Sequence, residues 1–306
     1  MIKQLAKIIL CAAFLSACSN NQDRRPEDTP VSGELILYSD PSFEPLVNAE
    51  RLLFEGTYAQ AAIKPEYIPE TDAIRKFVKG ETDFIVAGRL LTDEERNVFK
   101  SKEISIREHA AGRDAIAFAV HPSFPDSAID FRVLRKIFEG EITSWKQVNK
   151  SYPDIAVRIV ADQNNSGNIR VIHDSLGLSL EKVKVYGAGS NPEVFNYVAE
   201  NPWTIGITGV GWISDAEDRR GSDLYKKIKV LGITKDGNMY LPFQGNIADG
   251  TYPLIRNIYL IYSAARTGLG TGFASFILNE KGQRLVQKKG LVPVKIPSRD
   301  IEFKYE

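Results

Sequence analysis

The amino-acid sequence predicts an α/β fold with two lobes, each built on a mostly parallel sheet flanked by helices, joined by a two-strand hinge. Two observations lead to this prediction. Short β-branched runs alternate with runs of helical apolar spacing along most of the 306 residues, which is typical of parallel sheets covered by helices. Two further strand-like segments, 115–120 and 229–241, are placed so that they could connect one lobe with the other.

The expected elements follow from local patterns. Strands are expected where apolar or β-branched residues run together, and helices where apolar residues recur three or four positions apart. The expected strands are 34–39, 62–68, 83–87, 115–120, 155–161, 182–186, 205–208, 229–233 and 257–262. The expected helices are 43–54, 71–78, 129–138, 169–176, 192–200, 272–279 and 282–288. Open α/β sheets bind ligands at the carboxyl ends of their strands, so the loops there are candidate sites.

The lobes are expected to be discontinuous in sequence. If both crossing segments join the same two lobes, residues 118–239 form the second lobe, and residues 33–117 plus 240–306 form the first. Such an arrangement places a cleft between the lobes and allows hinge closure around a ligand.

The N-terminal segment predicts export and lipid attachment. An apolar run at 8–17 follows a short basic stretch, and it is too short to span a membrane, which needs about 20 apolar residues. It ends in Leu15-Ser16-Ala17-Cys18, which resembles a bacterial lipobox. We therefore expect a signal peptide at 1–17, lipidation of Cys18 and a flexible tether at 18–32. The alternative is an ordinary signal peptide that is cut elsewhere.

Composition excludes several classes of function. The 39 basic and 39 acidic residues give a formal net charge of zero, so a strongly basic nucleic-acid surface is not expected. The only cysteines are Cys11 and Cys18, which leaves no disulfide in the exported chain. The three histidines show no metal-ligand spacing. We expect a monomer that needs no cofactor or metal.

The turn at 162–168, Asp-Gln-Asn-Asn-Ser-Gly-Asn, is the strongest local indication of a binding site. It connects an expected strand to an expected helix, and the first amides of a helix have no intrahelical partners. These donors and the positive end of the helix dipole favour an anion. Asp162, Ser166, Gly167 and Asn168 are therefore candidate binding residues.

Five segments, in order, resemble the PstS-type phosphate-binding proteins of bacterial ABC transporters. They are 112–122, 134–145, 201–212, 249–260 and 282–293. The resemblance extends over roughly residues 33–297, and the variant motifs are similar to those of PstS-like lipoproteins of Bacteroidetes. It implies a periplasmic-binding-protein fold that captures an oxyanion, with phosphate expected first, and delivers it to ABC permease subunits. The implied location is extracytoplasmic, at a membrane to which the N-terminal lipid anchors the protein.

The resemblance also implies ligand residues. Ser42-Phe43 matches the first ligand loop of the family, Ser166-Gly167-Asn168 matches two of the three positions of its Ser-Gly-Thr loop, and Thr71 is a looser match.

Two departures from the family pattern concern charge. The sequence has Gly88-Arg89 where the family has Ser-Asp, and Asp162 where the family has Arg. We hypothesise that Arg89 and Asp162 form a charge-swapped pair across the cleft, in which Arg89 contacts the anion through its planar fork. The alternative is that Arg89 is a surface residue paired with Glu94 or Glu95.

Two rival functions remain open. A protein of the same fold could serve sensing or adhesion and bind another small ligand. An exported hydrolase would need Ser166 as nucleophile and His173 as base. Seven residues along a helix span roughly 10 Å, which is too far for a direct hydrogen bond. We therefore do not expect an enzyme.

Overall fold

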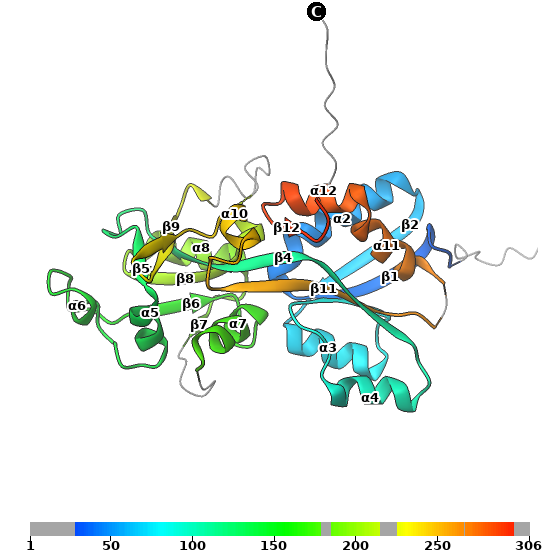
Figure 1. The fold of residues 1–306 in the computed structure, drawn as a ribbon, viewed down its shortest axis with the longest axis horizontal. Helices are drawn as coiled ribbons and strands as arrows, with labels where there is room; N and C mark the ends of the chain where they lie inside the picture. Colours follow the sequence, from blue (N-terminus) through cyan, green and yellow to red (C-terminus); the bar gives the residue numbers. More distant parts are fainter. Residues whose placement is uncertain (1–27, 179–184, 215–224, 266, 297–306) are drawn as a thin grey trace, which may run out of the picture.

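The structure is a computed structural model that describes residues 28–178, 185–214, 225–265 and 267–296. Figure 1 shows two groups of elements side by side, with strands β4 and β11 running through the middle. We call residues 28–115 and 255–296 the first half and residues 116–254 the second half, because β4 changes its pairing partners after Ala115 and β11 begins at Ile255. The expected signal peptide, Cys18 and most of the expected tether lie outside the described residues.

The first half is a mixed sheet with helices on both faces. Parallel strands β2, β1 and β3 are followed by β11, which is antiparallel to β3 and β4. One apolar cluster packs α2, α11 and α12 on one face, and another packs α3 and α4 on the other. The strands are β1 (Ser32–Ser39), β2 (Gln60–Tyr67), β3 (Phe84–Ala87), β11 (Ile255–Ser263) and β12 (Val292–Pro293). The helices are η1 (Pro41–Phe43), α2 (Glu44–Thr57), α3 (Glu70–Lys79), α4 (Asp93–Ser101), α11 (Leu269–Leu278) and α12 (Glu280–Lys288).

The second half repeats this layering around a smaller sheet. Strand β6 runs parallel to β7 and β8, and β8 pairs antiparallel with the end of β4. The strands are β5 (Ala128–Asp130), β6 (Arg158–Ala161), β7 (Tyr186–Gly187), β8 (Thr204–Gly209), β9 (Lys229–Lys235) and β10 (Asn238–Tyr240). The helices are α5 (Phe131–Phe138), α6 (Trp145–Val148), α7 (Gly167–Leu176), α8 (Asn191–Glu200), η3 (Val210–Trp212) and α10 (Gln244–Ala248).

Strand β4 (Ile106–Val120) joins the two halves. Its residues up to Ala115 pair with β11 in the first half, and residues 116–120 pair with β8 and β9 in the second. The part from Ala115 onward is fully buried, since neighbouring strands lie on both sides and apolar clusters cover both faces. A continuous buried strand fixes the two halves to one shared backbone element.

The predicted fold class is confirmed, although some elements differ from those expected. The segment 229–241 forms the β9–β10 hairpin, which pairs with β4 and β5 inside the second half. It was expected to be a crossing strand, but its turn at Asp236-Gly237, both with positive φ, reverses the chain. Helix α4 was not expected, because its apolar positions are few. Its capping box between Thr92 and Glu95 stabilises its start instead.

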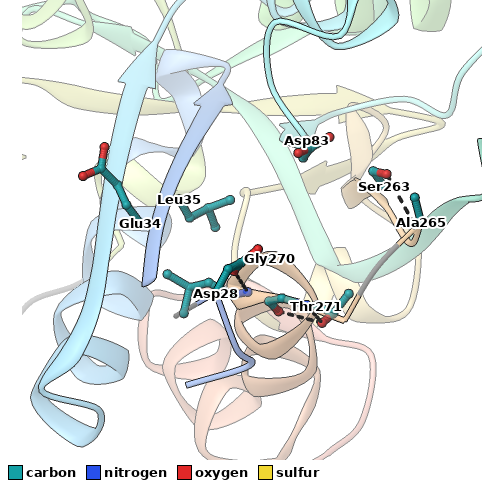
Figure 2. Close-up of a pocket in the computed structure, with 10 residues that line it drawn as sticks. Asp28, Glu34, Leu35, Asp83, Ser263, Ala265, Gly270 and Thr271 are labelled. Carbon is teal, nitrogen blue, oxygen red and sulfur yellow. Dashed lines mark hydrogen bonds between the residues drawn. The ribbon is translucent and has the colours of Figure 1, made fainter. Parts of the chain in front are cut away.

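The start of the described chain is attached to the first half. The Asp28 carboxylate accepts a hydrogen bond from the Leu269 amide at 2.8 Å, at the beginning of α11. Figure 2 shows this contact in a pocket of about 220 Å³, which Glu34 and Asp83 also line. Among the described residues, no helix is both long and apolar enough to cross a bilayer.

Candidate functional site

The candidate site lies where the two halves meet. Strands β1 and β3 of the first half and β6 of the second each end here, and each is followed by a turn. The turn after β1 begins η1, with Asp40 as N-cap and Pro41 in the first turn. The turn after β6 leads to Ser166, the N-cap of α7. Two helix starts therefore face each other across the junction.

The Asp40 carboxylate occupies the centre of this junction. Its Oδ1 accepts hydrogen bonds from the Ser42 amide, at 3.0 Å, and from the Ser42 hydroxyl. Its Oδ2 accepts from the Gly167 amide of α7 at 2.9 Å and from the Glu70 amide of α3 at 3.3 Å. Asp40 is fully buried. A carboxylate of the chain itself thus takes the position in which the helix starts favour an anion.

An ion pair also joins the halves. Glu70 at the start of α3 accepts from Arg170 Nε of α7 at 2.6 Å, and its other oxygen accepts from the Gly88 amide. The Glu70 side chain is 4% exposed and the Arg170 side chain 29%. The acid therefore comes from the first half and the base from the second.

A second, deeper ion pair lies between β4 and β11. Arg256 donates to Asp114 Oδ2 from Nη2 at 2.6 Å and from Nε at 3.0 Å, while the Val210 amide donates to Asp114 Oδ1 at 3.1 Å. The guanidinium carbon lies 4.4 Å from the centroid of the Phe43 ring. Arg256 Nη1 points toward the junction. A Cβ atom added to Gly167, at the start of α7, would lie 3.4 Å from Arg256 Nη1 and 3.1 Å from Asp40 Oδ2, so both atoms lie next to Gly167.

Several buried polar atoms around Asp40 have no hydrogen-bond partner among the described residues. They are both carboxylate oxygens of Asp162, Ser166 Oγ, Asn168 Nδ2 and Arg256 Nη1. Buried polar groups in folded proteins are almost always paired. A cluster of unpaired donors and acceptors beside a helix start is therefore the mark of a polar ligand site.

Asp162 has an unusual protonation equilibrium. Burial, and then the negative charge of Asp40, raise its pKa from 3.8 to about 6. The nearby Ser166 hydroxyl and the positive charge of Arg256 act in the opposite direction. This carboxyl group therefore changes its protonation state closer to neutral pH than an ordinary aspartate does.

Most of the residues predicted from the sequence lie at this junction. Ser42, Phe43, Asp162, Ser166, Gly167 and Asn168 are all buried there, and Ser42 Oγ lies 3.1 Å from Asn168 Oδ1 across the halves. Thr71 lies at the rim, where its hydroxyl is 3.5 Å from the Asn165 carbonyl oxygen.

The proposed pair of Arg89 and Asp162 is wrong. Both terminal nitrogens of Arg89 donate to the Glu95 carboxylate at 2.8 Å, so the surface alternative is the correct one. Glu95 is held in place by the capping box of α4, which offers Arg89 a partner six residues away. The ion pair that joins the halves is Glu70 with Arg170. Its acid lies in the first half and its base in the second, which is the arrangement expected from the family pattern.

Five residues of the junction were not expected from the sequence: Asp40, Glu70, Asp114, Arg170 and Arg256. Two of them carried a signal, because Asp114 and Arg256 are charged residues inside otherwise apolar strand segments. Asp40 before Pro41 is a typical helix-start pattern, but nothing local indicates that its carboxylate reaches α7. His173 Nδ1 lies 3.1 Å from Asp174 Oδ1, and no hydrogen bond connects its ring to Ser166.

Comparisons with known proteins agree with this architecture. The family model described as the PBP superfamily domain matches residues 25–281. The phosphate-binding protein PstS of Staphylococcus haemolyticus is 28% identical over 213 residues, which are 68% of this chain and 65% of the relative. The PstS of Staphylococcus epidermidis (strain RP62A) is 23% identical over 282 residues, 90% of this chain and 84% of the relative.

Solved structures have the same fold. A phosphate ABC transporter substrate-binding protein from Clostridium perfringens, with bound phosphate, has a TM-score of 0.73 at 21% identity, over 86% of this chain and all of the other. An ABC-type phosphate transport receptor from Vibrio cholerae has a TM-score of 0.64 at 20% identity, over 85% of this chain and all of the other. The predicted PstS-type resemblance is confirmed, and the chain belongs to the PBP superfamily domain family.

Proposed function

We propose that this protein captures an oxyanion, with phosphate as the ligand, between its two halves and delivers it to an ABC importer. The observation that carries the proposal is the junction itself, where donors from both halves converge on one buried anion position around Asp40. The PstS relatives support the choice of phosphate.

The number of donors at the junction is sufficient for useful affinity. Micromolar binding requires about 8 kcal/mol, while a helix dipole supplies only about 0.3–1 kcal/mol. Hydrogen bonds to a charged group contribute about 1.5–3 kcal/mol each, so roughly four to six donors are needed. The Asp40 carboxylate engages the Ser42 amide, the Ser42 hydroxyl and the Gly167 amide. An anion that takes the place of this carboxylate would receive these three donors and also Asn168 Nδ2 and Arg256 Nη1, which have no partner in the described chain.

Asp162 favours phosphate over sulfate in this proposal. Its buried carboxylate oxygens have no hydrogen-bond partner in the described chain. A carboxylate can accept a hydrogen bond from hydrogen phosphate, which carries a proton, but it repels fully ionised sulfate.

The two halves would act as lobes that enclose the ligand, because only the closed form brings donors from both halves together. The second-half core includes Tyr252 and Leu254, which supports a lobe boundary near residue 254, later than the residue 240 expected from the sequence. Lipid attachment at Cys18 and an extracytoplasmic location complete the proposal. They rest on the N-terminal sequence pattern.

Titration calorimetry of the exported chain tests the proposed function. The protein is prepared at pH 7 in a buffer without phosphate or sulfate, and each anion is then titrated into it. Phosphate is expected to bind with a Kd of about 1 μM or tighter, and the Kd for sulfate is expected to be at least about tenfold higher. Absence of heat and of thermal stabilisation with millimolar phosphate would contradict the proposal. Incorporation of labelled palmitate into the wild type, and its loss in Cys18→Ser, tests the anchor separately.

A further inference from the structure

We propose that Asp40 is the resident anion of this site: its carboxylate holds the two halves together in the ligand-free protein, and an incoming oxyanion has to displace it. The displacement step rests on the proposed function, whereas the closure of the halves by Asp40 does not. Asp40 would then determine both the affinity and the selectivity of the site.

The contacts of Asp40 exceed those of an ordinary helix cap. An N-cap carboxylate accepts from the amide two or three positions later, and the contact with the Ser42 amide meets that description. The additional contacts do not. Gly167 lies 127 positions away on α7, and Glu70 lies 30 positions away on α3. The same carboxylate therefore receives donors from three helix starts and from both halves.

The excess of buried acids explains why an anionic ligand cannot bind beside Asp40. The acids Asp40, Glu70, Asp114 and Asp162 are all buried at the junction, and Arg256 and Arg170 are the basic residues paired with two of them. Buried like charges at hydrogen-bond distance repel strongly. A phosphate dianion added next to an ionised Asp40 would increase this excess, so Asp40 has to leave as the ligand arrives.

The remaining unpaired donors explain why a tetrahedral oxyanion can displace the Asp40 carboxylate. A carboxylate has two oxygens, and those of Asp40 are already engaged, so Arg256 Nη1 and Asn168 Nδ2 have no partner in the described chain. An oxyanion with four oxygens can take the donors of Asp40 and also reach those two groups. Planar carboxylate ligands offer no such gain over Asp40, and the site would therefore select tetrahedral oxyanions over carboxylates.

The test compares two variants in the otherwise unchanged exported chain. Asp40→Ser keeps a hydroxyl that can cap the Ser42 amide but is too short and uncharged to hold Gly167. Asp130→Ser is the matched control, because Asp130 is also an N-cap carboxylate, which accepts from the Arg132 amide at 2.7 Å on the exposed start of α5. Circular dichroism confirms that each variant is folded before any comparison.

The first measurement needs no ligand. Hydrogen exchange of the Gly167 amide and the radius of gyration from X-ray scattering are measured in the absence of phosphate. In the wild type and in Asp130→Ser, the amide is expected to be protected and the particle compact. In Asp40→Ser, exchange at Gly167 is expected to be about tenfold faster or more and the radius of gyration larger. Equal protection in all three proteins would overturn the role of Asp40 in closure.

The second measurement is the Kd for phosphate and for acetate. Asp40→Ser is expected to bind phosphate about tenfold more tightly or more and to gain measurable acetate binding, while Asp130→Ser behaves as the wild type. Unchanged or weaker phosphate binding in Asp40→Ser would overturn the displacement. If neither the wild type nor Asp40→Ser binds phosphate, the proposed function and the displacement both fail. The exchange rate of the Gly167 amide then decides by itself whether Asp40 closes the halves.

Discussion

Replacing Asp162 with asparagine is expected to stabilise the folded protein at neutral pH. Asp162 is 1% exposed, and neither of its carboxylate oxygens has a hydrogen-bond partner in the described chain. Burial and the neighbouring charge of Asp40 raise its pKa from 3.8 to about 6. Asparagine has nearly the same shape but does not ionise, so the variant does not bury a negative charge beside Asp40.

The direction of the pH dependence follows from proton linkage. A carboxyl group with a higher pKa in the folded than in the unfolded chain binds its proton more tightly when folded. Its contribution to the free energy of unfolding is therefore fully present below pH 3.8, decreases as the pH rises to about 6, and stays low above that. The whole change corresponds to about 3 kcal/mol.

Urea unfolding of the wild type and Asp162→Asn at pH 4 and pH 8, without phosphate, measures this effect. The variant is expected to be more stable by up to about 3 kcal/mol at pH 8 and nearly equal to the wild type at pH 4. The control is Asp93→Asn, whose side chain is 92% exposed and whose effect should stay within about 0.5 kcal/mol. A difference between wild type and Asp162→Asn that is the same at both pH values would refute the reasoning.

Three further substitutions test other parts of the structure. Arg256→Met leaves Asp114 buried without its ion partner, so the free energy of unfolding should fall by about 3–5 kcal/mol, and a loss below 1 kcal/mol would mean that the pair is not buried as described. Arg89→Ala removes contacts with Glu95 and with the Leu90 carbonyl oxygen, both outside the junction, so calorimetry should give an unchanged phosphate Kd, and a large loss of affinity would show that Arg89 belongs to the site. Gly206→Ala places a Cβ within 2.7 Å of a valine methyl of α8, so thermal unfolding should show a loss of about 1–3 kcal/mol, and full stability would indicate that α8 can shift at no cost.

Local patterns were sufficient for most of the longer elements and for the α7 half of the candidate site. Apolar periodicity depends on neighbouring residues, and the strand–turn–helix pattern around Ser166-Gly167 predicts free amides wherever the helix is placed. The true partner of Arg89 was also within reach of the sequence, since the capping box of α4 places Glu95 only six residues away. The hypothesis that joined Arg89 to Asp162 gave too much weight to a family position and too little to this local competitor.

What the sequence by itself determined was the α/β alternation, the start of α7 and the family resemblance. The tertiary structure alone decided which charged groups meet: Arg256 with Asp114, 142 residues apart, Arg170 with Glu70, 100 residues apart, and Asp40 with the Gly167 amide, 127 residues apart. The reason is physical. Helices and turns are specified by hydrogen bonds between near neighbours in the chain, whereas ion pairs between distant residues depend on strand register and on how the two halves pack.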